Sequence, residues 1–336
     1  MATKARSKKK PVRSKPSTVM PSRSFDVLVL ATMSAGKTSF INALIGQELL
    51  HAANEATTAC LTRVEHRSRA KAFGGVTYCH AERELERHAH TTREQMCLWN
   101  ADAGVKKIHL SGRFRSTPRQ ACGLVLHDTP GPNNSQDERH ERLMFEALGT
   151  VSFKVLCYVL NASQLGTTDD RALLAQVRER LAQRSGYQWV FILNKVDLLD
   201  PERGEGIATC VANARAYLQG LGFEQPIIIP TMANAALYAR KVLDTQPLTR
   251  VERSRLHQAL GGLDEYKQHL SAASDVPAAI GRQVAKDLRQ LEKACQAKPV
   301  DCQSRETLQL QQLIACSGIR TVETLIKHQR RLVISA

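Results

Sequence analysis

The sequence predicts an α/β fold in which a mostly parallel sheet is covered by helices on both faces, with a short C-terminal helical extension. The first observation is a set of near-continuous apolar runs, which are typical of strands buried on both faces. These runs lie near residues 25–30, 121–127, 154–160, 187–193 and 226–230. The second observation is that helical segments alternate with them, near residues 37–45, 137–149, 169–183 and 204–220. This alternation indicates βαβ units, in which ligands bind at the carboxyl ends of the strands.

The first of these strands leads into a phosphate-binding loop. Residues 31–38 read Ala-Thr-Met-Ser-Ala-Gly-Lys-Thr, which is the spacing of a P-loop between a strand and a helix. Gly36 allows the backbone N–H groups to come close to a phosphate, and Lys37 supplies a positive charge for the β and γ oxygens. The hydroxyl of Thr38 is placed to bind Mg²⁺. The loop therefore predicts a nucleoside triphosphate as ligand.

Two later strands end in motifs that narrow the ligand to GTP. Residues 128–131 read Asp-Thr-Pro-Gly, in which Asp128 suits Mg²⁺ and the N–H of Gly131 suits the γ-phosphate. Residues 194–197 read Asn-Lys-Val-Asp, and the carboxylate of Asp197 is suited to accept hydrogen bonds from the N1–H and 2-amino groups of guanine. Adenine offers neither donor there, and a buried carboxylate left unpaired costs about 1–3 kcal/mol or more.

Four stretches around these motifs carry a family resemblance. They are residues 31–46, 57–62, 127–134 and 160–170. Together they resemble bacterial dynamin-family GTPases, and among these the GTPase domain of the enterobacterial clamp-binding group that co-localises sister replication forks. The resemblance covers about residues 24–240, with a weaker echo at 317–326. It implies a P-loop GTPase domain that binds GTP with Mg²⁺ and hydrolyses it to GDP and phosphate.

The resemblance also implies roles for individual residues. Thr58 matches the switch threonine that closes on Mg²⁺ and the γ-phosphate, and Ser34 matches the serine that holds a monovalent cation (K⁺ or Na⁺) and positions the attacking water. Asp200 matches an acidic residue that reaches the base bound in a facing subunit. The implied catalytic residues are Ser34, Lys37 and Thr58, and the implied Mg²⁺ ligands are Thr38, Thr58 and Asp128. The implied GTP-binding residues are Ser34, Ala35, Gly36, Lys37, Thr38, Ser39, Asp128, Gly131, Asn194, Lys195, Asp197 and Asp200.

The sequence departs from familiar GTPase patterns in ways that bear on hydrolysis. Pro132 follows Gly131, and proline cannot orient the attacking water as the glutamine of Ras-like proteins does. In dynamins a monovalent cation and a facing GTPase domain supply what is missing, so the resemblance implies a homodimer that stimulates turnover. Ala31 stands where dynamins usually have glycine, and residues 230–235 replace the more usual Ser-Ala pair of the base loop.

Length and composition predict three regions in the chain of 336 residues, of which 43% are hydrophobic. We expect a disordered basic tail at 1–24, a dynamin-type GTPase domain at 25–242 with an insertion at about 66–118, and a helical extension at 243–336 that packs on the GTPase domain. An apolar stripe at helical spacing supports the extension, formed by Ile280, Val284, Leu288, Leu291 and Cys295. The stripe also suits a partner helix. Since the extension is too short for a dynamin stalk, a partner protein that supplies one is a further expectation.

The charge of the chain is concentrated at its start. Residues 1–24 hold eight Lys and Arg and no acid, out of a net charge of +15. Such a tail predicts contact with nucleic acid or an anionic membrane, and a solubilising role is an equal alternative. An alternative function is therefore a GTP-regulated scaffold or switch on DNA, the replication machinery or RNA, with little intrinsic hydrolysis. Nine scattered cysteines, no signal-peptide core and no apolar run near the ~20 residues that span a bilayer predict a cytoplasmic protein.

The insertion contains extended pieces and one polar segment. Residues 81–88, Ala-Glu-Arg-Glu-Leu-Glu-Arg-His, predict a solvated helix. Nearby cysteines and histidines suggest a metal site, but their spacing matches no standard zinc pattern, so the solvated helix is favoured.

Overall fold

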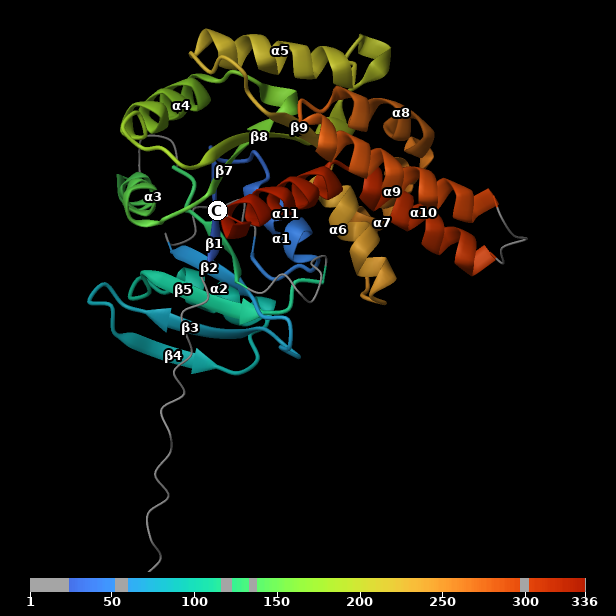
Figure 1. Ribbon diagram of the computed structural model, residues 1–336. Helices are drawn as coiled ribbons and strands as arrows, with labels where there is room; N and C mark the ends of the chain where they lie inside the picture. The colour runs from blue at the N-terminus through green and yellow to red at the C-terminus, as the bar shows by residue number, and fades with distance from the viewer. Residues whose placement is uncertain (1–23, 52–59, 116–122, 133–137, 297–301, 336) are drawn as a thin grey trace, which may run out of the picture.

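The computed structural model describes residues 24–51, 60–115, 123–132, 138–296 and 302–335 (Figure 1). Within these ranges the strands form one nine-stranded sheet, in the order β4-β3-β5-β2-β6-β1-β7-β8-β9. The strands are β1 (Phe25–Ala31), β2 (Leu61–His66), β3 (Gly74–Tyr78), β4 (Glu84–His88), β5 (Lys107–Gly112), β6 (Leu124–Asp128), β7 (Val155–Asn161), β8 (Gln188–Asn194) and β9 (Ile228–Thr231). From β6 to β9 every neighbouring pair is parallel, whereas β2 pairs with β6 and β3 pairs with β4 and β5 in the antiparallel sense. The predicted α/β class with a mostly parallel sheet is confirmed.

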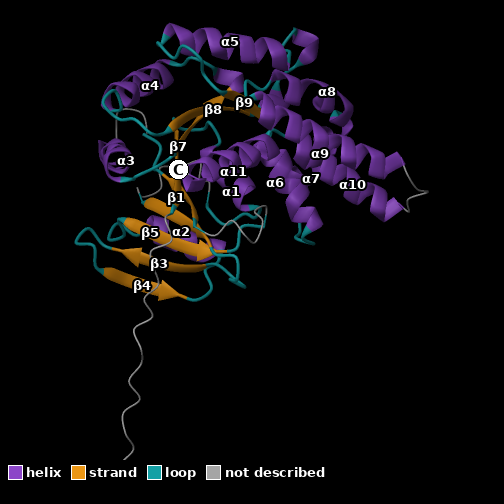
Figure 2. Ribbon diagram, in the orientation of Figure 1, coloured by secondary structure: helices purple, strands orange, loops and turns teal. Residues whose placement is uncertain are grey.

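Helices cover both faces of this sheet, as Figure 2 shows. They are α1 (Lys37–Ile45), α2 (Arg93–Ala101), α3 (Glu138–Thr150), α4 (Thr168–Arg180), α5 (Ile207–Gly220), α6 (Ala233–Leu243), α7 (Arg250–Gly261), α8 (Leu263–Ala273), α9 (Ala278–Gln296), α10 (Cys302–Cys316) and α11 (Ile319–Ser335). Successive side chains of β1 point into two different hydrophobic cores. Val27 and Val29 belong to the core that contains α1 and α11. Leu28 and Leu30 face the one that contains α3, α4 and α5. Because β1 is buried on both sides, it is the rigid base from which the loop after it leaves.

The helix predicted at residues 81–88 is wrong. Glu84–His88 is the edge strand β4, which pairs antiparallel with β3 after a turn in which Glu82 has φ +58°. The indole of Trp99 donates to Glu86 at 2.7 Å, so α2 holds this edge. The segment has no apolar face with which a helix could pack, whereas pairing with β3 satisfies its backbone. Its exposed charges also discourage pairing with another chain.

The C-terminal helices form a layer beside α6 and β9 (Figure 1). Three residues of the predicted apolar stripe, Ile280, Val284 and Leu288, are buried along α9. The boundary predicted at residue 242 and the role of the extension stay predictions, and residues 1–23 of the predicted tail lie outside the described ranges. None of the described helices is both long and apolar enough to cross a membrane.

The turn between α10 and α11 is fastened to the segment that follows β9. The N–H of Met232 donates to the carbonyl oxygen of Ser317 at 2.9 Å. Gly318 has φ +79°, and a Cβ added there would lie 2.0 Å from the carbonyl oxygen of Pro230. Glycine is therefore required by both conformation and space.

Replacing Gly318 with alanine should lower the free energy of unfolding by about 2–4 kcal/mol, because the new Cβ must displace backbone. Gly281→Ala is the matched control: Gly281 lies inside α9, and no atom lies within 4 Å of its added Cβ. Alanine there should stabilise the helix by about 0.5–1 kcal/mol. Urea unfolding of both variants measures the two changes. A Gly318→Ala protein as stable as the parent would contradict the close packing of this turn.

Candidate functional site

The loop between β1 and α1 has a backbone shape that suits an anion. Ser34 has φ +61° and Gly36 has φ +88°, and α1 begins at Lys37. Left-handed residues just before a helix turn successive N–H groups toward one concave space, where the helix dipole also favours negative charge. A Cβ added to Gly36 would lie 2.4 Å from Nδ2 of Asn194. Only glycine fits this position, because Asn194 comes so close.

The side chain of Asn194, at the end of β8, connects three segments. Its Nδ2 donates to the carbonyl oxygen of Ala35 at 3.1 Å. Its Oδ1 accepts from the hydroxyl of Thr231 and from the N–H of Ala233, both at 3.2 Å. Asn194 is buried, so these bonds are shielded from water. One amide therefore joins the P-loop, the end of β8 and the start of α6, so residues 231–233 lie beside the P-loop.

Lys195 makes the second contact between β8 and the P-loop. It has φ +68°, and its Nζ donates to the carbonyl oxygen of Ser34 at 2.5 Å. Desolvation lowers the pKa of its ammonium group, against the nearby charge of Asp197. Desolvation also raises the pKa of the Asp197 carboxyl, which its own N–H, Arg255 and Lys195 oppose. Among the described residues no side chain donates a hydrogen bond to Asp197, so its oxygens can accept from a ligand.

The second motif meets the P-loop through an ion pair. Lys37 and Asp128 are in contact, and both side chains are largely buried, 11% and 15% exposed. The hydroxyl of Thr129 donates to the carbonyl oxygen of Val29 at 2.9 Å. Gly131 lies beside the loop, since a Cβ added to it would be 3.7 Å from the carbonyl oxygen of Ala31. The end of β6 is therefore held next to the start of α1.

Oxygen ligands at this junction fit Mg²⁺. The hydroxyl of Thr38 belongs to the first turn of α1, next to Lys37, which contacts the Asp128 carboxylate. Hydroxyl and carboxylate oxygens are the ligands that Mg²⁺ prefers. Ser39 follows in the same turn, while Thr58 falls within residues 52–59, outside the described ranges. No group of three or more His, Cys, Asp or Glu side chains in the described part of the chain could hold a metal ion.

Asp200 is not brought together with the other predicted residues. It lies in an exposed turn, where its Oδ1 accepts from the N–H of Glu202 at 3.0 Å. Its Oδ2 lies 3.2 Å from Nε of Arg203. The carboxylate is 43% exposed, so it is open to a second molecule.

A buried hydrogen-bond network supports the P-loop and could not be predicted from the sequence. The hydroxyl of Thr32 donates to Asp170 at 3.1 Å, and the hydroxyl of Tyr158 donates to the same oxygen at 2.8 Å. Burial raises the pKa of the Asp170 carboxyl, against these two hydrogen bonds. An acidic residue in the first turn of α4 resembles an ordinary helix-dipole residue. Nothing in the local sequence indicates that it faces the P-loop.

Three features lie together at the carboxyl ends of parallel strands. They are the P-loop after β1, the carboxylate at the end of β6 and the Asn-Lys-Val-Asp motif at the end of β8. This arrangement defines a P-loop nucleotide-binding domain. The family model described as Dynamin family matches residues 27–196, half of the chain. The chain therefore belongs to the dynamin family, whose members are GTPases.

Comparison with solved structures gives distant matches. Two are described as an oligomerised bacterial dynamin pair that provides a mechanism for the long-range sensing and tethering of membranes. They are 16% and 15% identical to this chain, each with a TM-score of 0.49, and cover 81% and 82% of it. This chain covers 44% and 55% of theirs, so it spans about half the length of the structures it matches. No curated protein matches the sequence significantly.

Asn194→Ala should lower the free energy of unfolding by about 2–4 kcal/mol, because three buried hydrogen bonds are lost. Asn100→Ala is the control, since within the described part of the chain the amide of Asn100 makes one hydrogen bond, to the carbonyl oxygen of Met96 in α2 at 2.9 Å. That change should cost about 1 kcal/mol or less. Urea unfolding compares them. Equal losses would mean that the Asn194 amide does not join the three segments.

Proposed function

We propose that this dynamin-family chain binds GTP with Mg²⁺ and hydrolyses it to GDP and phosphate. The observation that carries the proposal is the double contact between the end of β8 and the P-loop. Asn194 donates to Ala35 and Lys195 donates to Ser34, so a base-reading segment and a phosphate-binding loop are held as one unit. Asp197 lies next to this unit in the sequence, and its carboxylate oxygens are available to accept hydrogen bonds from a ligand. A purine with donors on its Watson–Crick edge, as guanine has, satisfies that carboxylate, whereas adenine leaves it unpaired.

The residues of the site divide the work of phosphoryl transfer, which depends mainly on positioning and charge neutralisation. The N–H groups of the P-loop and the Lys37 ammonium bind the phosphates. Thr38 and Asp128, with Thr58 from the undescribed segment, would hold Mg²⁺, which supplies charge neutralisation when bound. The N–H of Gly131 bonds the γ-phosphate. With Mg²⁺ and nucleotide bound, Asp128 would contact the metal cation and Lys37 would contact the phosphate oxygens. Each side chain would then exchange its partner in the ion pair for another group of opposite charge.

Hydrolysis is stimulated, in this proposal, by pairing of two GTPase domains into a homodimer. Pro132 leaves the chain without a glutamine at the water-orienting position. Ser34 is exposed, and so is much of Asp200, so both are open to a facing subunit. Ser34 positions water and a monovalent cation, K⁺ or Na⁺, and Asp200 reaches the partner's base. A switch with little intrinsic hydrolysis is the second candidate, and the same proline favours it.

The setting of this activity is proposed from the sequence. The resemblance to the clamp-binding group points to DNA and the replication machinery, and the basic tail at residues 1–24 suits nucleic acid or an anionic membrane. A partner protein that supplies a stalk is part of the same proposal. A cytoplasmic location agrees with the cysteine pattern.

Lys37→Ala should reduce GTP turnover by about 100-fold or more, because charge stabilisation at the phosphates is lost. Lys286→Ala, which removes an exposed lysine from α9, should leave turnover unchanged. Phosphate release under saturating GTP measures both. Full activity in Lys37→Ala would remove the P-loop from the reaction.

Asp197→Asn should weaken GTP binding by about tenfold or more and shift preference toward xanthosine triphosphate. In the parent protein GTP affinity should fall as pH is lowered, since guanine needs the ionised carboxylate. Because burial raises the pKa of Asp197, this fall should begin above the pH at which an ordinary aspartate is protonated. Calorimetric titration at several pH values with both nucleotides tests this. An unchanged guanine preference in the variant would rule out base reading by Asp197.

A further inference from the structure

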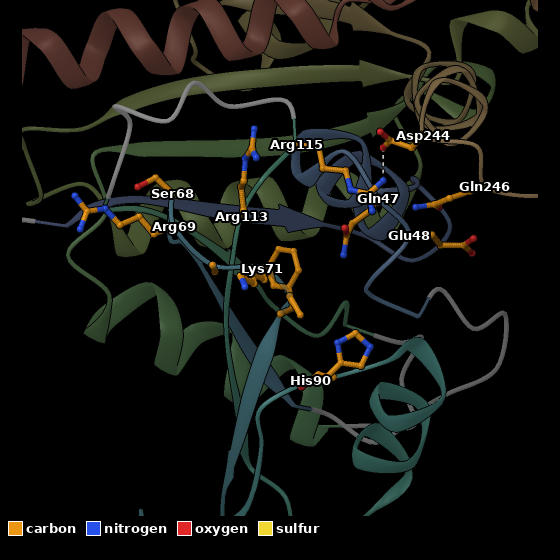
Figure 3. Close-up of a pocket in the computed structure, with 14 residues that line it drawn as sticks. Gln47, Glu48, Ser68, Arg69, Lys71, His90, Arg113, Arg115, Asp244 and Gln246 are labelled. Carbon is orange, nitrogen blue, oxygen red and sulfur yellow. Dashed lines mark hydrogen bonds and ion pairs between the residues drawn. The ribbon is translucent and has the colours of Figure 1, made fainter.

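A large polar cavity lies at the other end of the sheet from the P-loop. Its volume is about 1120 Å³, and it is drawn in Figure 3. Helix α1 starts at the P-loop, and the residues that follow its last turn, Gln47 and Glu48, line the cavity. Strand β2 runs antiparallel to β6, with Thr62 opposite Asp128, so the residues after β2 leave the sheet at the end away from Asp128. The cavity is therefore separate from the nucleotide site.

Three cationic side chains at this cavity have no acidic partner among the described residues. They are Arg69 and Lys71, in the connection between β2 and β3, and Arg113, directly after β5. Arg115 differs, because it pairs with Asp244 and its N–H donates to the carbonyl oxygen of Ile45 at 2.8 Å. Figure 3 shows Arg69 and Arg115 on opposite sides of Arg113. The cavity therefore carries positive charge that no acidic side chain of the described residues neutralises.

Acidic residues at the rim do not cancel this charge. Glu48 is 3.0 Å from Arg93 and 2.9 Å from Lys241, neither of which lines the cavity. Asp244 is the partner of Arg115. The pKa of His66, behind the cavity, is lowered by burial and then by Arg330 and Arg113, which agrees with a positive potential at this edge.

The sheet and its core hold the two chain segments that carry these cations. Strands β2 and β5 are parallel with His66 opposite Gly112, so the chain leaves both strands side by side. The ring of Phe73 anchors the β2–β3 connection: it is buried, stacks on Phe114 at 6.3 Å between ring centroids, and lies 2.4 Å from where a Cβ on Gly112 would be. This packing fixes the ends of the segment that carries Arg69 and Lys71.

We propose that this cavity is a second anion site, which binds a compact molecule with two or more phosphate groups. Arginine forks bind phosphate through paired hydrogen bonds, and lysine adds a point charge. Known small-molecule cavities are about 300–1000 Å³, so a polyphosphate fits this volume. Phe73 is buried, so it offers no stacking surface for nucleic-acid bases. None of the exposed large apolar side chains in the described ranges lines the cavity, so it has no group that inserts into a bilayer.

Calorimetric titration with inorganic tripolyphosphate tests the site. The full-length chain carries Lys37→Ala throughout, so that anion binding at the P-loop is weakened. Adding Arg69→Ala and Arg113→Ala should lower the affinity for tripolyphosphate by about tenfold or more, because two charge-assisted contacts are lost. The control pair, Arg282→Ala with Arg289→Ala, removes equal charge from exposed positions on α9 and should change affinity by less than about twofold.

Equal losses of tripolyphosphate affinity in the two double variants would show an effect of net charge alone and would overturn the proposal. The absence of tripolyphosphate binding would also overturn it. Thermal unfolding of each variant checks that the fold persists; Lys71→Gln, at an exposed position, repeats the test if the arginine pair unfolds. A second arm compares inositol hexakisphosphate with vesicles containing 5% phosphatidylinositol bisphosphate. Arg69- and Arg113-dependent binding to either supports the site and tells a free polyphosphate from a lipid headgroup. If the changes at Arg69 and Arg113 weakened binding to duplex DNA alone, that result would contradict a small-molecule site.

Discussion

The buried amide of Asn194 is the constraint on which the nucleotide end of this molecule depends. It donates to the P-loop at Ala35 and accepts from Thr231 and Ala233, so three segments distant in sequence share one side chain. An aspartate would lose the donor, and an aliphatic residue would leave the buried partners unsatisfied. Its close approach also explains why position 36 must be glycine. The loop after β1 and the segment after β9 therefore form one packed unit.

The segment after β9 is supported from its other side by the C-terminal helices. Met232 donates to Ser317, and Gly318 lies against the carbonyl oxygen of Pro230. Because Thr231 lies between these contacts and Asn194, the segment from Pro230 to Ala233 is held on both sides. The turn before α11 is thus part of the support of the site, although it lies about ninety residues further along the chain.

The parallel strands β1, β6, β7, β8 and β9 and the three motifs could be predicted from the sequence, because each depends on local information. Residues 27–31 are apolar on both faces of β1, and the loop after them combines Gly36 with Lys37 at fixed spacing. Strand β4 could not be predicted, because its charges suit a solvated helix and only pairing with β3 selects the extended form. The contact of Thr32 with Asp170 could not be predicted from the sequence either, since it joins residues 138 positions apart. Long-range contacts of this kind leave no periodic signal.

In the proposed function, turnover depends on two facing GTPase domains, because Pro132 cannot orient the attacking water as a glutamine does. The most direct measurement is the GTP hydrolysis rate per mole of protein over a wide range of protein concentration, at saturating GTP and fixed Mg²⁺ and K⁺. Dimer-stimulated hydrolysis predicts a specific rate that rises with concentration and levels off once the protein is dimeric. A flat, slow rate at all concentrations would contradict dimer-stimulated hydrolysis and would favour a switch that waits for a different partner.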